Sequence, residues 1–183
     1  MQNIENGSFL ISHPTLLEES FFKAIVLVTH HNFEETIGLV INHPSKIKLH
    51  EIIDDIPNSD FPVYIGGPVS KNSIHFIHSL GRLIPNSIKI YKGLYFGGDF
   101  DVVKDLLWKG KISKDNMRFF AGYSGWEANQ LEDELKENSW ILKEKNLKLS
   151  MKYSDKDYWS EIIRKMDKKY ALWANFPKDP SLN

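Results

Sequence analysis

The sequence predicts an α+β fold in which a curved, partly closed β-sheet carries helices on its outside. Two observations support this class. Short runs of β-branched and aromatic residues follow one another through the first hundred positions without helical patterns between them, and helices are indicated only after that point. A doubly wound sheet would need a helix between successive strands, so it is the poorer alternative.

The expected strands share a high content of β-branched and aromatic side chains. They cover residues 8–12, 24–30, 37–42, 63–66, 73–78, 88–91 and 94–96, and a further buried run covers 119–121. The connection 32–35 is short enough to join the second and third strands as a hairpin.

Three helices follow from capping residues and apolar spacing. Asp99 can cap a helix over 100–109 that Gly110 ends. Ser154 and Asp157 resemble a capping arrangement for a helix over 155–169, whose apolar face is formed by Trp159, Ile162, Ile163, Met166 and Tyr170. The third helix begins after the tryptophan at 126.

Length and composition favour one domain over residues 1–183, with an extended C-terminal arm at 176–183 where two prolines occur. Hydrophobic residues make up 42% of the chain, which is enough for a packed core. The 23 basic and 24 acidic residues give a net charge of −1, so no overall field attracts DNA, and direct nucleic-acid binding is not expected.

The location predicted for the protein is the cytoplasm. The chain has no cysteine, which excludes disulfides and thiol chemistry and fits a reducing compartment. Its apolar runs are too short to span a bilayer, and the N-terminus lacks the basic start of a signal peptide. No membrane partner is expected.

The stretch 119–135 (FFAGYSGWEANQLEDEL) is interpreted as a strand-to-helix corner. Gly122 and Gly125 permit backbone angles and close approaches that a Cβ would block, and Leu131 and Leu135 recur at helical spacing. Ser124 invites comparison with a hydrolase nucleophile, but G-x-S-x-G requires glycine where Trp126 stands. Capping of the following helix, with Glu127 completing a capping box, is the favoured role for Ser124, and Asn129 with Glu132 offers the same box in a later register.

These motifs together resemble the YqgE/AlgH family of bacterial proteins. The matching segments are GSFLISHP at 7–14, the β-type run around 22–28, GLVIN at 38–42, GGPV at 66–69 and GYSGW followed by QLEDEL at 122–135. The resemblance implies a mixed, strongly bent β-sheet that forms a pseudo-barrel, and it comes without an assigned biochemical activity, although one branch of the family is labelled a transcriptional regulator. One departure is Asn129, where the family commonly has glycine; asparagine tolerates a positive φ and is also a good helix N-cap.

The histidines are candidate metal ligands, and two glycine pairs are candidate anion sites. His30 and His31 are adjacent and point to opposite faces of a strand, and His75 and His78 also diverge, so no metal site is expected. The sequences GGP at 66–68 and GGD at 97–99 each follow a strand and could expose N–H groups to an anion, but a tight turn is the favoured reading. No cofactor is expected.

A recognition surface is predicted instead. Trp126, Gln130 and Glu134 lie about one helical turn apart and form a face distinct from the leucine face, although packing of Trp126 into the core is at least as well supported. Because strand ends gather at one rim of a bent sheet, a single concave ligand site is expected. Its residues are Asn42, Gly66, Gly67, Pro68, Gly122, Tyr123, Gly125, Trp126, Gln130 and Glu134.

Three functions remain open on sequence grounds. The first is a non-enzymatic protein that binds an unknown small molecule or protein partner and regulates transcription, if at all, indirectly. The second is a hydrolase that uses Ser124 or a carboxylate and histidine pair. The third is a homo-oligomeric structural module.

Overall fold

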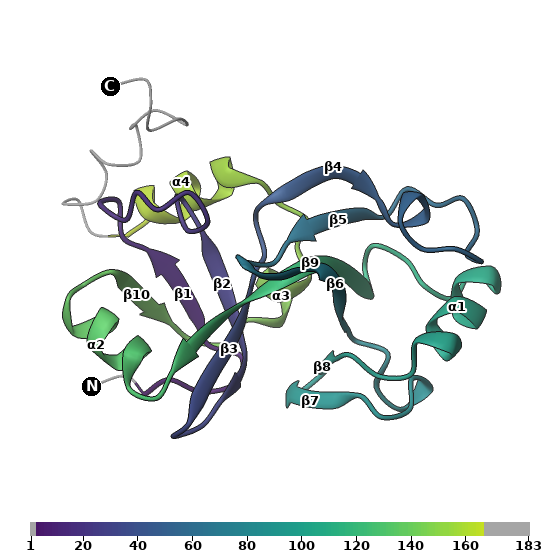
Figure 1. The fold of residues 1–183 in the computed structure, drawn as a ribbon, viewed down its shortest axis with the longest axis horizontal. Helices are drawn as coiled ribbons and strands as arrows, with labels where there is room; N and C mark the ends of the chain where they lie inside the picture. The colour runs from purple at the N-terminus through teal and green to yellow at the C-terminus, as the bar shows by residue number, and fades with distance from the viewer. Residues whose placement is uncertain (1–2, 167–183) are drawn as a thin grey trace.

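A ten-stranded sheet runs through the computed structural model, which describes residues 3–166 (Figure 1). The main strand order is β10-β1-β2-β3-β9-β6-β8-β7, with β5 beside β9 and β4 beside β5. Strand β5 is parallel to β9 and the other pairs are antiparallel, so the sheet is mixed. In the described chain the end strands β10 and β7 do not pair with each other, so the bent sheet is open where a pseudo-barrel was expected. The bounds of the strands are β1 Phe9–Ser12, β2 Ile25–His31, β3 Glu35–Val40, β4 Pro44–Lys48, β5 Pro62–Ile65, β6 Val69–His78, β7 Ile88–Tyr91, β8 Leu94–Phe96, β9 Met117–Glu127 and β10 Trp140–Lys143.

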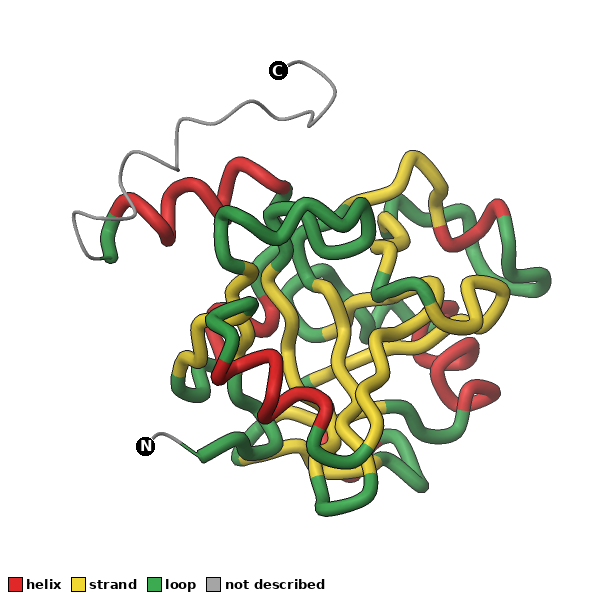
Figure 2. The backbone as a smooth tube through the Cα atoms, turned by 60° about the vertical axis from the view of Figure 1, so that its left-hand side comes forward, coloured by secondary structure: helices red, strands yellow, loops and turns green. Residues whose placement is uncertain are grey.

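Short helices lie around the outside of the strands (Figure 2). They are α1 Phe100–Trp108, α2 Gln130–Lys136, α3 Leu147–Met151 and α4 Lys156–Arg164, with 3-10 turns at Leu49–Glu51 and Gly81–Leu83. Asp99 caps α1 as predicted, because its side chain accepts hydrogen bonds from two backbone N–H groups of the first turn. The predicted continuation of α4 to residue 169, Tyr170 of its face and the arm at 176–183 lie outside the described residues.

The predicted cap of α4 is wrong by one residue. The N-cap is Asp155, whose carboxylate accepts from the backbone N–H of Asp157 at 2.9 Å. Ser154 instead donates its backbone N–H to the hydroxyl of Tyr64. The cap therefore places a carboxylate at the positive end of the helix dipole.

The hairpin and the seven early strands are confirmed, with small shifts of their ends. Asn32 forms the hairpin turn, because its side-chain oxygen accepts from the N–H groups of Glu34 and Glu35. Sequence reasoning missed β4, β10 and the short α3. Strand β4 begins at Pro44 and is rich in lysine, which is typical of a sheet edge with few packing demands, so it lacks the apolar alternation that identifies a strand.

Alternating side chains divide the core between the two faces of the sheet. In the fully buried β1, Phe9 and Ile11 join one cluster with Trp159 of α4, while Leu10 faces a second cluster with Trp126 and Trp140. A third cluster packs α1 against the β5, β6 and β9 part of the sheet. Figure 1 shows β9 crossing between the two halves of the molecule that these clusters fill.

The predicted strand-to-helix corner is wrong, because residues 117–127 form one continuous strand and α2 begins only at Gln130. Gly122 has a different structural role. With φ of +69°, it lies at the point where the neighbour of β9 on one side changes from β5 to β3. Asn129 does take the expected positive φ of 63° at the N-cap of α2, but its side chain makes no capping hydrogen bond.

Arg118 of β9 is fully buried, and no carboxylate of residues 3–166 forms an ion pair with it. Its guanidinium donates to the carbonyl oxygens of Ile41 (2.6 Å) and Ser150 (2.9 Å), and it lies 4.5 Å from the ring centroid of Tyr64 and 5.1 Å from that of Tyr153. Burial lowers the pKa of Arg118 to about 10, which still leaves it charged at neutral pH. Carbonyl dipoles and aromatic faces therefore stabilise this charge and tie β9 to the segment that leads into α4.

Candidate functional site

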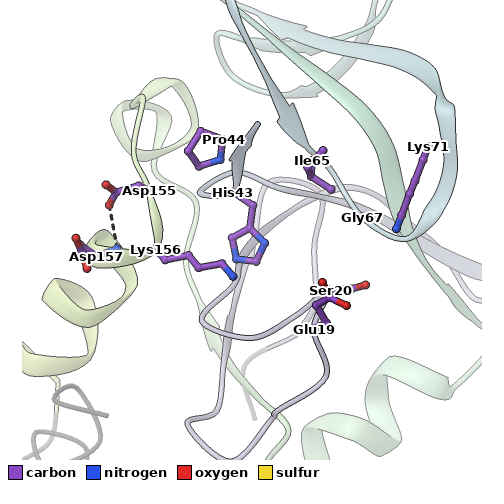
Figure 3. Close-up of a pocket in the computed structure, with 10 residues that line it drawn as sticks. All are labelled: Glu19, Ser20, His43, Pro44, Ile65, Gly67, Lys71, Asp155, Lys156 and Asp157. Carbon is purple, nitrogen blue, oxygen red and sulfur yellow. Dashed lines mark hydrogen bonds between the residues drawn. The ribbon is translucent and has the colours of Figure 1, made fainter. Parts of the chain in front are cut away.

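A cleft of about 560 Å³ opens between the start of α4, the β3–β4 connection and the β5–β6 connection (Figure 3). A volume of this size suits a small molecule. Its lining combines two lysines, three carboxylates, a histidine and a few small or apolar groups: Glu19, Ser20, His43, Pro44, Ile65, Gly67, Lys71, Asp155, Lys156 and Asp157.

Asn42 lies beneath the cleft and holds the neighbouring backbone in place through buried hydrogen bonds. Its side chain is fully buried, and its oxygen accepts from the backbone N–H of Ile25 at 2.7 Å while its amide nitrogen donates to the carbonyl of Lys23 at 2.8 Å. A longer contact of 3.4 Å joins the same nitrogen to the carbonyl of Asp155. Asn42 thus fixes the chain next to His43 and connects it to α4, and its own polar groups are not directed at the cleft.

The glycine pair at 66 and 67 forms the opposite wall through close backbone packing. A Cβ on Gly66 would lie 2.3 Å from the carbonyl oxygen of Gly122, and one on Gly67 would lie 2.3 Å from the carbonyl of Tyr123. The N–H of Gly66 donates to the carbonyl of Ala121 at 2.8 Å. The absence of side chains lets this segment cross β9 directly, and Gly67 lines the cleft. The neighbouring Pro68 is exposed and is not among the lining residues.

His43 is the most unusual side chain of the cleft. It is 9% exposed, and within residues 3–166 its buried Nε2 atom has no hydrogen-bond partner. The pKa of His43 is lowered from 6.5 to about 4, mainly by burial and also by the nearby charge of Lys156, while hydrogen bonding to the backbone of Lys23 and Phe22 opposes the decrease. His43 is therefore a neutral imidazole near pH 7, and it lines the cleft with one buried ring nitrogen left without a hydrogen bond.

The first turn of α4 supplies the second basic group. Lys156 is the first residue of this nine-residue helix, and its ammonium group points toward the His43 ring (Figure 3). The ammonium also lies 5.6 Å from the ring centroid of Phe22. The helix dipole and the lysine together make this side of the cleft positive, while the exposed carboxylates of Glu19, Asp155 and Asp157 make its rim negative.

Ser124 neither caps a helix nor lies in the cleft. It is fully buried inside β9, and its hydroxyl donates to the carbonyl oxygen of Gly66 at 3.1 Å. The predicted capping role is therefore wrong, because the helix begins six residues later. Gly125 is exposed and has no positive φ, and an added Cβ would meet only ordinary contacts, so the special backbone expected there is absent as well.

The predicted Trp126, Gln130 and Glu134 face exists as a hydrogen-bonded cluster. Glu134 Oε2 accepts from Trp126 Nε1 at 2.9 Å and from Trp140 Nε1 at 2.7 Å, and Glu134 Oε1 accepts from Gln130 Nε2 at 2.9 Å. Trp126 is only 3% exposed and packs beside Phe21. The core packing of Trp126 that was the alternative is what the structure has, and these residues do not line the cleft.

The predicted site is thus brought together only in part. Gly66, Gly67 and Gly122 converge with Tyr123 where the β5–β6 connection crosses β9, and Asn42 lies under the same cleft. Of Asn42, Gly67 and Trp126, which were expected to border one cavity, only Gly67 lines this one. Within residues 3–166, no group of three or more histidine and acidic side chains is placed to hold a metal ion, and no helix is long and apolar enough to cross a membrane.

Comparison with known proteins agrees with this architecture. The family model described as AlgH-like matches residues 9–171. The chain belongs to the AlgH-like family. Among its relatives, UPF0301 protein BF2109 of Bacteroides fragilis is 39% identical over 97% of this chain and 90% of its own length, and a UPF0301 protein of Chlorobium limicola is 36% identical over 97% of this chain and 95% of its own length.

Two solved structures share the fold. The solution structure of the AlgH protein from Pseudomonas aeruginosa superposes with a TM-score of 0.72 at 24% identity, covering 97% of this chain and 99% of that protein. Protein DIP2367 from Corynebacterium diphtheriae gives a TM-score of 0.74 at 21% identity, covering 96% of this chain and 94% of that one. The bent α+β sheet is therefore the AlgH-like fold.

Sequence reasoning missed His43 and Lys156 in this AlgH-like chain. His43 was not singled out, although it follows directly on a buried strand and the Asn42 that the family motif singles out. That position was the available signal. Lys156 had none, because more than a hundred residues separate it from His43 and only the packing of α4 brings them together.

Proposed function

We propose that the protein is a non-enzymatic cytoplasmic binding protein whose cleft receives a small molecule. The observation that carries this proposal is His43 Nε2, a buried polar atom without a partner in the wall of a cavity. A buried nitrogen without a hydrogen bond is costly, and a bound molecule that supplied one would recover that cost. Any effect on transcription is proposed to be indirect, because a net charge of −1 gives no overall field that attracts DNA.

The hydrolase alternative has less support. The Ser124 hydroxyl is buried and engaged with the Gly66 carbonyl, so it is not available to attack a substrate. His31 and Glu132 approach to 3.9 Å, but neither lines the cleft. The carboxylate of Glu134 already accepts hydrogen bonds from two indole N–H groups and from an amide.

Native mass spectrometry of freshly purified protein tests the proposal. We expect the wild type to retain a small molecule, and Ile65→Trp, which fills the cleft from β5, to lose it. Ile88→Trp is the matched control, because Ile88 is an exposed strand residue that does not line the cleft. Retention by neither the wild type nor the control, or equal retention by all three proteins, would contradict a ligand-binding cleft.

A hydrolase screen tests the non-enzymatic part. Wild-type protein is expected to show no turnover that Ser124→Ala abolishes. Turnover that disappears in Ser124→Ala while the melting temperature stays unchanged would establish the serine as a nucleophile and overturn this assignment.

A further inference from the structure

Two groups in the cleft wall favour the same kind of ligand. Among the ion pairs of residues 3–166, none involves Lys156, whose ammonium points toward the His43 ring (Figure 3). His43 itself is nine-tenths buried, and its Nε2 has no partner. An ammonium beside an unsatisfied imidazole nitrogen is an arrangement that a negatively charged oxygen would complete.

The helix end adds to this preference. The first turn of α4 borders the cleft, and helix N-termini favour anions through their unpaired N–H groups and their dipole. The Asp155 carboxylate already occupies one of these groups, the N–H of Asp157, at 2.9 Å. The helix end alone would therefore be weak evidence, and the independent observation is the buried nitrogen of His43.

We infer that the cleft binds the single oxyanion group of a small molecule, a phosphate or a carboxylate, between His43 Nε2, the Lys156 ammonium and the first turn of α4. This inference rests on the proposed binding function and specifies its ligand. On binding, His43 takes up a proton from solvent at Nε2 and donates it in a hydrogen bond to the oxyanion. The covalent bond formed is the Nε2–H bond of His43, and no covalent bond to the ligand is made.

The rim restricts the rest of the ligand. Glu19, Asp155 and Asp157 are exposed carboxylates around the entrance, and Lys71 faces them from the other wall. Exposed charges are screened by water and salt, so they do not prevent one anionic group from reaching the buried nitrogen. A second anionic group would lie at the rim itself, close to these carboxylates, where the repulsion is strongest. The ligand class is therefore a molecule with one oxyanion and hydrogen-bond donors elsewhere, rather than a polyphosphate.

Proton uptake makes the affinity depend on pH in a defined direction. Burial and the Lys156 charge keep free His43 neutral near pH 7. A bound anion offsets the Lys156 charge and raises the pKa of His43. The other charged groups around the ring are the cleft-lining Glu19, Asp155 and Asp157 and the neighbouring Lys23. Binding therefore weakens as pH rises through the pKa of His43 in the complex.

NMR titration of the full chain with sulfate and with acetate tests this inference, at constant ionic strength made up with chloride. Both probes keep their charge between about pH 6 and 8, and the two distinguish tetrahedral from planar oxyanions. We expect saturable shifts at His43 and the start of α4 for at least one probe, with weaker binding at the higher pH.

Variants assign the shifts to the cleft. His43→Asn retains an amide near the position of Nδ1 and removes Nε2, so it should weaken binding about tenfold and abolish the pH dependence. Lys156→Gln should weaken binding to a similar extent. Lys89→Gln on the exposed strand β7 is the control and should bind as the wild type does.

The outcomes separate this inference from the proposed function. Shifts spread over surface lysines, or equal binding by wild type and His43→Asn, would overturn the oxyanion assignment. If native mass spectrometry then finds a neutral molecule that Ile65→Trp loses, the binding function stands and only its ligand class is wrong. If no molecule is retained either, both are wrong.

Discussion

Replacing Gly122 by alanine should destabilise the protein far more than the same change at Gly110. Both glycines have similar positive φ values, +69° and +61°, so both substitutions incur about 1–2 kcal/mol for the left-handed backbone. At Gly110 nothing lies within 4 Å of the added Cβ. At Gly122 the Cβ would lie 2.7 Å from the carbonyl oxygen of Val69 and 2.9 Å from that of Gly67.

Those two oxygens belong to backbone, so β9 and the β5–β6 connection would have to move apart. Overpacking of this kind costs about 1–3 kcal/mol, which brings the total for Gly122→Ala to about 2–5 kcal/mol. For a chain of this size that corresponds to a decrease in melting temperature of about 4–20 °C, against about 2–8 °C for Gly110→Ala.

Urea unfolding followed by tryptophan fluorescence and circular dichroism measures both free energies of unfolding. Gly110→Ala serves as the control for backbone conformation alone. Equal losses of stability in the two variants would refute the reasoning, because they would mean that the close approach of the β5–β6 connection to β9 contributes nothing beyond the positive φ.

The remaining predictions concern the half-buried Glu134 and the buried Asn42 and His43. Glu134→Gln should lower the free energy of unfolding by about 1.5–3 kcal/mol, because an uncharged amide oxygen accepts more weakly than the carboxylate from Trp126 and Trp140, and the new NH2 group would face the donating amide of Gln130; unchanged stability and tryptophan emission would contradict this. Asn42→Asp should cost at least about 3 kcal/mol in thermal unfolding, since a carboxylate cannot donate the hydrogen bond that the buried amide makes. His43 has a lower pKa folded than unfolded, so stability is full above about pH 6.5 and falls by about 3 kcal/mol as pH falls to about 4; His43→Asn should remove this part of the pH dependence, and identical profiles would count against it.

Much of the fold follows from local sequence. Alternating apolar residues and turn formers are enough to indicate strands such as β2 and β3 with their Asn32 hairpin, and Asp99 fixes the start of α1 because a cap needs only its own first turn. The positive φ of Asn129 could also be predicted, since it depends on residue type more than on distant contacts.

The GYSGW segment shows where such reasoning stops. Glycines inside a strand and glycines at a corner look alike in sequence, and only the pairing of β9 with β5 and then β3 makes Gly122 a switch of partners within one strand. The same holds for Arg118, whose burial among Tyr64, Tyr153 and two carbonyl groups no local pattern indicates.

The sequence by itself determined the family and the α+β class, because these depend on residue type and order. The position of the cleft and the residues that line it depend on the tertiary structure alone. His43 and Lys156 are remote in sequence, and the depressed pKa of His43 arises from burial and from a charge that the docking of α4 brings beside it. Desolvation and electrostatic coupling depend on distances through space, which is why the sequence alone did not single out His43.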